Sequence, residues 1–98
     1  MGSGLVEFSP PKLVTGATLT VTAGSFQDIA ANSDRMELLI SNDDASGALY
    51  LRDTVAAAVG GTKLTAGATA VLTTGAAVRV FNNTGSTITA YYNEIRRK

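Results

Sequence analysis

The chain has 98 residues, the length of one domain, with 45% hydrophobic residues, 16% charged residues and a formal net charge of zero. This balance argues against nucleic acid as a partner, because nucleic-acid binding needs a basic face. Cysteine and histidine are absent, which excludes disulfides and removes the commonest general base and metal ligand. No apolar run approaches the roughly 20 residues of a membrane-spanning helix, so we expect no membrane partner.

Residues 1–16 differ from the rest of the chain and predict an extended N-terminal arm. Pro10 and Pro11 exclude a helix and a central strand there. The apolar residues on either side of the prolines are candidate contacts with a neighbouring subunit, namely Val6, Phe8, Leu13 and Val14. A partly disordered terminus is the alternative. The opening Met1–Gly4 lacks the features of a signal peptide and is either native or an expression scar.

Residues 17–98 predict a single domain built from short strands. Polar and apolar residues alternate, many of them are β-branched, and turn-forming residues recur about every ten positions. Strands are expected at 18–22, 26–30, 35–42, 48–52, 62–64, 68–73, 76–82 and 86–95. Residues 55–61 are ambiguous, and we interpret them as a surface loop with at most one helical turn.

The alternation also predicts which side chains face the core. In the strand at 35–42, Met36, Leu38 and Ile40 are expected on one face, opposite Arg35, Glu37, Leu39 and Ser41. In the later strands, the predicted inward residues are Leu49, Leu51, Ala70, Leu72, Val78, Val80, Ile88, Ala90 and Tyr92. We therefore predict an all-β fold: an antiparallel, jelly-roll-like β-sandwich of about eight short strands, preceded by the extended arm.

Several segments resemble small virion proteins of tailed bacteriophages. They are Ala31–Asn42, Gly47–Leu51, Gly61–Gly67, Thr69–Leu72 and Ala76–Val78, and the likeness covers about two-thirds of the chain. In the first segment an Asn and an Arg precede an alternating strand that ends in Asn. Proteins of this kind include head decoration (cement) proteins, head fibres and minor tail or neck components. The resemblance implies a β-sandwich and a place in a phage particle.

No residue set predicts catalysis, so we expect the protein not to be an enzyme. Lys12 and Lys63 lie in turn-rich stretches, and Asp43, Asp44 and Asp53 offer no distinct pair of carboxylates. The carboxylates at 43 and 44 do not have the spacing of a calcium loop and fit a solvated turn better. The run at 60–63 is only partly similar to a phosphate-binding loop, and we interpret it as a flexible connection. We expect neither a metal nor a cofactor.

Two further motifs have competing interpretations. The sequence Asn82-Asn83-Thr84 fits a glycosylation acceptor, but a tight turn explains it equally well. Tyr91 and Tyr50 together could line a patch for a sugar or a protein, whereas packing at the rim of the core is the simpler role.

Three arginines are candidate contact residues. Arg35 begins the strongest predicted strand and is expected to pair with Asp34 or Glu37, or to clamp a carbonyl at a subunit contact. Arg96 and Arg97 belong to a basic C-terminal tail that either contacts an acidic capsid surface or remains solvated.

These observations favour a phage virion structural protein. The leading hypothesis is a capsid decoration (cement) protein that binds the outer shell through the major capsid protein or other virion proteins and stabilises it by bridging subunits. We expect a homo-oligomer, with a trimer favoured, located on the capsid surface. The alternatives are a tail, neck or head-fibre accessory protein and a carbohydrate-binding adhesion domain. The last is less favoured because aromatic residues make up only 6% of the chain.

Overall fold

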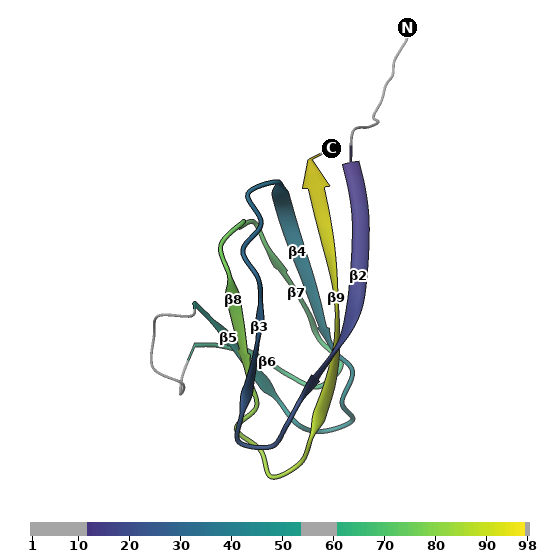
Figure 1. Ribbon diagram of the computed structural model, residues 1–98. Helices are drawn as coiled ribbons and strands as arrows, with labels where there is room; N and C mark the ends of the chain where they lie inside the picture. The colour runs from purple at the N-terminus through teal and green to yellow at the C-terminus, as the bar shows by residue number, and fades with distance from the viewer. Residues whose placement is uncertain (1–11, 54–60, 98) are drawn as a thin grey trace, which may run out of the picture.

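The computed structural model describes residues 12–53 and 61–97 (Figure 1). Within these ranges all regular structure is β-strand, arranged as two antiparallel sheets of four strands each. The predicted all-β sandwich is therefore confirmed. In the described part of the chain no helix could cross a membrane. The ambiguous segment 55–61, except for Gly61, lies outside the described residues, as do the arm residues Val6, Phe8, Pro10 and Pro11.

The two sheets share the strands evenly. The first sheet has the order β2-β9-β4-β7, and the second has the order β3-β8-β5-β6. The first sheet consists of β2 (Lys12–Val21), β9 (Ile88–Arg97), β4 (Arg35–Asn42) and β7 (Thr69–Leu72). The second consists of β3 (Phe26–Ile29), β8 (Val78–Phe81), β5 (Leu49–Arg52) and β6 (Thr62–Leu64).

The strand order is that of a jelly roll. Counted along the described chain, the first sheet contains the first, eighth, third and sixth strands, and the second contains the second, seventh, fourth and fifth. Most connections therefore cross from one sheet to the other, which produces the two Greek keys of this architecture. Figure 1 shows the first sheet extending beyond the second at the end where β2 begins and β9 ends.

The strand β2 begins earlier than the sequence predicted. It pairs with β9 in unbroken register from Lys12, opposite Arg97, to Val21, opposite Ile88. The predicted boundary after residue 16 therefore falls inside a strand. The sequence between Lys12 and Gly16 has only a weak alternating pattern, but β9 continues to Arg97 and provides hydrogen-bond partners along this whole length.

The core lies between the two sheets and consists of inward-pointing aliphatic side chains. The predicted inward residues Leu38, Ile40, Leu49, Leu51, Val78, Val80, Ile88 and Ala90 are all buried, together with Val21, Ile29 and Leu64. Three residues predicted to face inward, Ala70, Leu72 and Tyr92, pack against this cluster at its margin. Full burial of each large aliphatic side chain contributes about 1.5–3 kcal/mol to folding.

Met36 is the exception to the predicted pattern. Its side chain is 38% exposed, whereas Arg35 is only 4% exposed. The register of β4 against β9 passes from Arg35 opposite Arg96 directly to Glu37 opposite Ile95, so Met36 is the extra residue of a β-bulge. The bulge reverses the alternation at the start of β4. The prediction was therefore wrong for Met36, and Arg35 turns inward.

Candidate binding surfaces

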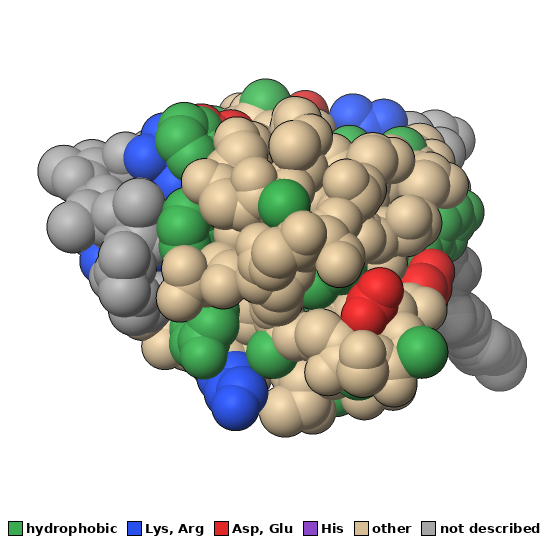
Figure 2. Space-filling view, turned by 90° about the horizontal axis from the view of Figure 1, so that it is seen from below, with side chains coloured by type: hydrophobic (Ala, Val, Ile, Leu, Met, Phe, Trp, Pro, Cys, Tyr) green, Lys and Arg blue, Asp and Glu red, His purple; other side chains and the backbone are tan. Residues whose placement is uncertain are grey.

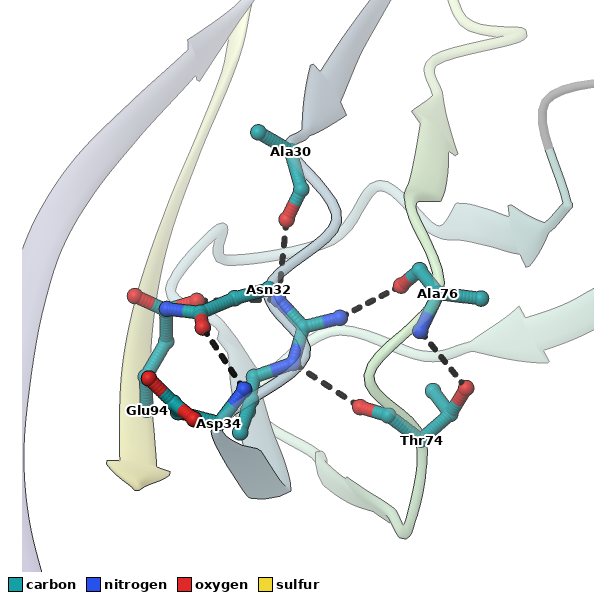
Figure 3. Close-up of polar contacts among 7 residues, drawn as sticks. Ala30, Asn32, Asp34, Thr74, Ala76 and Glu94 are labelled. Atoms are coloured by element: carbon teal, nitrogen blue, oxygen red, sulfur yellow. Dashed lines mark hydrogen bonds and ion pairs between the residues drawn. The ribbon is translucent and has the colours of Figure 1, made fainter. Parts of the chain in front are cut away.

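Arg35 is the buried cation at the end of the sandwich where β4 begins. Its side chain is fully buried and forms an ion pair with Glu94 at 2.9 Å. It also donates hydrogen bonds to the carbonyl oxygens of Thr74 (2.9 Å), Ala30 (3.1 Å) and Ala76. Figure 3 shows these acceptors converging from the β3–β4 connection, the β7–β8 connection and β9.

The predicted roles of Arg35 need correction. Its carboxylate partner is Glu94 on a neighbouring strand and neither Asp34 nor Glu37. It does clamp carbonyl groups, but they belong to loops of its own chain. Because the side chain is fully buried, it cannot contact the surface of a partner subunit. A buried guanidinium is tolerated only when it is paired and hydrogen-bonded, and this set of acceptors meets that requirement.

Two buried asparagines organise the opposite end of the sandwich. Asn42 ends β4 and donates from Nδ2 to the carbonyl oxygens of Gly47 and Leu64, both at 2.9 Å, while its Oδ1 accepts from the backbone N–H of Asp44. Asn82 follows β8 and is likewise 0% exposed. Its Nδ2 donates to the carbonyl oxygens of Val21 (2.9 Å) and Ser86 (2.7 Å).

These contacts bear on two sequence motifs. The amide nitrogen of Asn82 is buried and already used in two hydrogen bonds, so it is not accessible as a glycan acceptor. The carboxylate of Asp44 accepts the backbone N–H groups of Ser46 and Gly47 and closes its own loop. These hydrogen bonds lower the pKa of Asp44 below its usual value. No group of acidic side chains that could hold a metal occurs among residues 12–53 and 61–97.

The loops at this end present few charges. Figure 2 shows it mostly as backbone and uncharged polar side chains, with a few hydrophobic, acidic and basic groups. Short polar loops held by buried asparagines form a firm end to the sandwich but supply no converging set of reactive groups.

The outer face of the first sheet carries an apolar band across its strands. Val14, Val71 and Tyr91 are 66%, 57% and 42% exposed, and Leu39 and Ile95 are half-buried between them. The register places Val14 opposite Ile95 and Leu39 opposite Val71. These five residues are referred to below as the apolar band. Tyr91 and Leu39 point outward because the residues on either side of each face the core.

Uncharged polar side chains surround the apolar band. Away from the end formed by Lys12 and Arg97, the other outward positions in the described strands are mostly small or uncharged: Gly16, Thr18, Thr20, Ser41, Thr69, Thr89 and Asn93. Glu37 is the charged residue on this part of the face. Gly16 allows a close approach here. A Cβ atom at this position would lie 2.4 Å from Oδ1 of Asn93 and 2.9 Å from the Tyr91 hydroxyl. The Tyr91 side chain therefore lies across Gly16.

The outer face of the second sheet is charged. Arg79 forms a two-pronged ion pair with Asp28, with distances of 2.9 and 3.0 Å, and its guanidinium lies 3.8 Å from the ring centroid of Phe26. The hydrogen bond from Arg79 lowers the pKa of Asp28. Tyr50 lies in the next row of this sheet, between Phe81 and Lys63.

Tyr50 and Tyr91 do not form the shared patch that the sequence suggested. Tyr50 points outward from the second sheet, between the buried residues Leu49 and Leu51. Tyr91 points outward from the first sheet. The two rings therefore lie on opposite outer faces of the sandwich. Tyr92 packs at the margin of the core, as predicted.

The remaining contact candidates lie along β2 and β9. Leu13 pairs with Arg96 through the backbone, and Val14 is exposed on the outer face. Arg96 is half-buried and Arg97 is exposed, and both are strand residues. The backbone N–H of Arg97 donates to the carbonyl oxygen of Asp34 at 2.6 Å. The basic residues that the sequence placed in a tail are thus held in the first sheet up to Arg97.

A pocket of about 270 Å³ lies between the sheets. Its lining combines aliphatic residues with the charged and polar residues Arg52, Asp53, Thr62 and Thr74. Asp53 directly precedes the segment 54–60, which lies outside the described residues. Among the described lining residues Asp53 is the one carboxylate, so they offer no carboxylate pair, and we assign no chemistry to the pocket.

No protein-family model matches the chain, and no curated protein is significantly similar to it.

Proposed function

We propose that this protein is a virion structural protein of a tailed bacteriophage, and specifically a capsid decoration (cement) protein. In this proposal the apolar band docks on the outer shell, contacts the major capsid protein and stabilises the shell by bridging its subunits. The observation that carries the proposal is the contrast between the two outer faces. Away from the end where Lys12 pairs with Arg97, the described outward positions of the first sheet include exposed apolar side chains and one charged residue, Glu37, whereas the outer face of the second sheet carries the Arg79–Asp28 ion pair.

The nearly uncharged face is suited to dock on another protein. Removing an exposed valine or tyrosine side chain from water contributes on the order of 1 kcal/mol or more. The surrounding threonine, serine and asparagine side chains lose less on desolvation than charges would. A single copy would therefore bind the shell with modest affinity. Contacts repeated over a lattice, or from an oligomer, raise the overall affinity through effective concentration.

The fold is compatible with this role. Jelly rolls are used by viral capsid domains and by lectins, and a fold alone does not define a function. The sequence resemblance to small phage virion proteins supports the first class. The lectin-like alternative requires an accessible aromatic face for a sugar. The ring of Phe26 is already covered by the guanidinium of Arg79, and Tyr91 stands on the opposite face from Tyr50, which disfavours that alternative.

The deciding experiment is the copy number of the protein in purified phage particles, measured by quantitative mass spectrometry against a labelled standard. Hundreds of copies per particle would support a shell location. A dozen or fewer would instead support the alternative of a neck, tail or head-fibre component. Absence from the particle would contradict the proposal of a virion protein altogether.

A further inference from the structure

The strand β2 is an unusually open sheet edge. It is at the end of the first sheet and pairs with β9 over all ten of its residues without a register shift. The other three edge strands of the described sheets, β7, β3 and β6, have four, four and three residues. Short edge strands are one means by which proteins avoid pairing with another chain, and β2 lacks that protection.

The backbone groups that face the open edge can be identified from the hydrogen bonds of β9. The carbonyl oxygen of Thr89 accepts from the N–H of Asp43, and the N–H of Arg97 donates to the carbonyl oxygen of Asp34, next to the two ends of β4. The odd-numbered residues of β9 therefore direct their backbone N–H and C=O groups toward β4. The even-numbered residues of β9 direct their backbone N–H and C=O groups toward β2, and their register partners in β2 are odd-numbered. The even-numbered residues of β2 consequently direct their N–H and C=O groups away from the sheet, namely Lys12, Val14, Gly16, Thr18 and Thr20.

Nothing in the described part of the chain blocks this edge. Between Leu13 and Val21 there is no proline, no charged residue and no bulge. Each of these features commonly prevents strand addition. No other strand among residues 12–53 and 61–97 pairs with the outer side of β2. The edge thus offers a row of hydrogen-bonding groups to an incoming strand.

We propose that β2 pairs antiparallel with β2 of a second copy of this chain, about a two-fold axis at Gly16. In this register Gly16 meets its own counterpart, Val14 lies opposite Thr18 of the second copy, and Lys12 lies opposite Thr20. All outward-directed backbone groups of β2 then face one another. The first sheet of one copy and the first sheet of the other become one continuous eight-stranded sheet, with both apolar bands on the same side of it.

Charge favours the antiparallel orientation over the parallel one. Lys12 is the charged residue of β2, and its register partner Arg97 is also basic. Parallel pairing would bring these basic ends together, whereas antiparallel pairing separates them by roughly 25 Å, at about 3.3 Å per residue. The zero net charge of the chain adds no further repulsion between copies.

Gly16 and Tyr91 suit the position of the axis. The absence of a side chain at Gly16 avoids crowding where the two strands cross the axis, and the Tyr91 ring lies over it on the outer face. Tyr91, which is 42% exposed in one copy, becomes more buried in the pair. The inference does not depend on the virion role, because the dimer is a property of the purified protein.

The first test is the variant Thr18→Pro, with Thr18→Val as the matched control. The N–H of Thr18 points away from β9, so proline removes no hydrogen bond of the fold but blocks the proposed pairing. Sedimentation equilibrium of the full chain should give twice the chain mass of 10.1 kDa for the wild type and Thr18→Val, and a single chain mass for Thr18→Pro. Circular dichroism should show the same folded spectrum for all three proteins.

A second pair of variants tests the register without proline. Val14→Lys/Thr18→Lys places like charges opposite one another and should abolish the dimer, whereas Val14→Lys/Thr18→Glu places opposite charges together and should retain it. A wild-type monomer or trimer at all concentrations would overturn the proposal. So would a dimer that survives Thr18→Pro, or equal behaviour of the two charge variants.

Discussion

Asn42 and Asn82 are structural counterparts, one at the end of a strand in each sheet. Each donates one Nδ2 hydrogen bond to a carbonyl in its own loop and one to a carbonyl of the opposite sheet, Leu64 for Asn42 and Val21 for Asn82. Each also accepts at Oδ1 from the backbone N–H two residues later. Both side chains are 0% exposed. Each asparagine thus joins the two sheets at the same end of the sandwich.

The asparagines are predicted to be among the most sensitive polar positions. Asn42→Ala and Asn82→Ala should each lower the free energy of unfolding by about 2–4 kcal/mol, because two carbonyl groups, one of them in a buried hydrogen bond, and one N–H lose their partner. Urea denaturation measures the change. The matched control is Asn83→Ala, at an exposed position next to Asn82, which should change stability by less than about 0.5 kcal/mol. Equal effects of Asn82→Ala and Asn83→Ala would show that the hydrogen bonds of Asn82 contribute little.

The Arg35 cluster should show the behaviour of a buried ion pair. Arg35→Met keeps the aliphatic part of the side chain but leaves Glu94 and the loop carbonyls without their donor, and should cost about 3–5 kcal/mol of unfolding free energy. Arg79→Met removes the partly exposed ion pair with Asp28 and should cost much less, because solvent screens an exposed pair. Thermal and urea unfolding compare the two variants. A smaller loss for Arg35→Met than for Arg79→Met would contradict the assigned importance of the buried cluster.

Acid should destabilise the protein through Asp28 and Asp44. Both have a lower pKa in the folded state, because of hydrogen bonds from Arg79 and from the Gly47 and Ser46 N–H groups, respectively. The unfolded chain binds protons first as the pH falls, so stability is fully present above the ordinary aspartate pKa of about 3.9 and is lost as pH falls through the folded-state value. Urea unfolding followed across this acid range should show a shallower decline for Asp44→Asn than for the exposed control Asp43→Asn. Identical declines would count against a role for Asp44.

The docking role of the apolar band can be tested at Val71. Its side chain is 57% exposed, so Val71→Asp should change the free energy of unfolding by less than about 1 kcal/mol. The same substitution places a charge in the proposed contact with the shell and should weaken attachment to particles about tenfold or more. Lys63→Glu alters the charge of the opposite face and serves as the control. Particle occupancy measured by mass spectrometry should fall for the first variant only; if it falls equally for both, the band is not the docking face.

The regular alternation in the sequence was sufficient to predict the sandwich and most of its core. The pairs Leu49 and Leu51, Val78 and Val80, and Ile88 and Ala90 face inward because each lies in a strand without irregularity. Met36 could not be placed correctly, since the bulge depends on how β4 aligns with β9, a strand more than fifty residues later. The same long-range alignment explains why the start of β2 was missed.

The polar anchors were also beyond local sequence reasoning. Arg35 was singled out by its position before a strong strand, but its acceptors Thr74, Ala76 and Glu94 lie far away in sequence. Asn42 and Asn82 appeared as ordinary turn residues, and only the packing of the two sheets reveals that they are buried. One signal does distinguish them: Asn42 is the last residue of an inward-alternating strand and Asn82 directly follows one, and at both places a small amide can reach the carbonyls of the facing sheet.

The pairing of Lys12 with Arg97 has a practical consequence for protein engineering. Because the first and last described residues of the fold are neighbours, a short linker between them should permit circular permutation, with new ends opened in one of the exposed loops at the far end. A peptide fused after Arg97 would begin beside Lys12. Such a fusion would leave the loops held by Asn42 and Asn82, at the opposite end of the sandwich, accessible to other molecules.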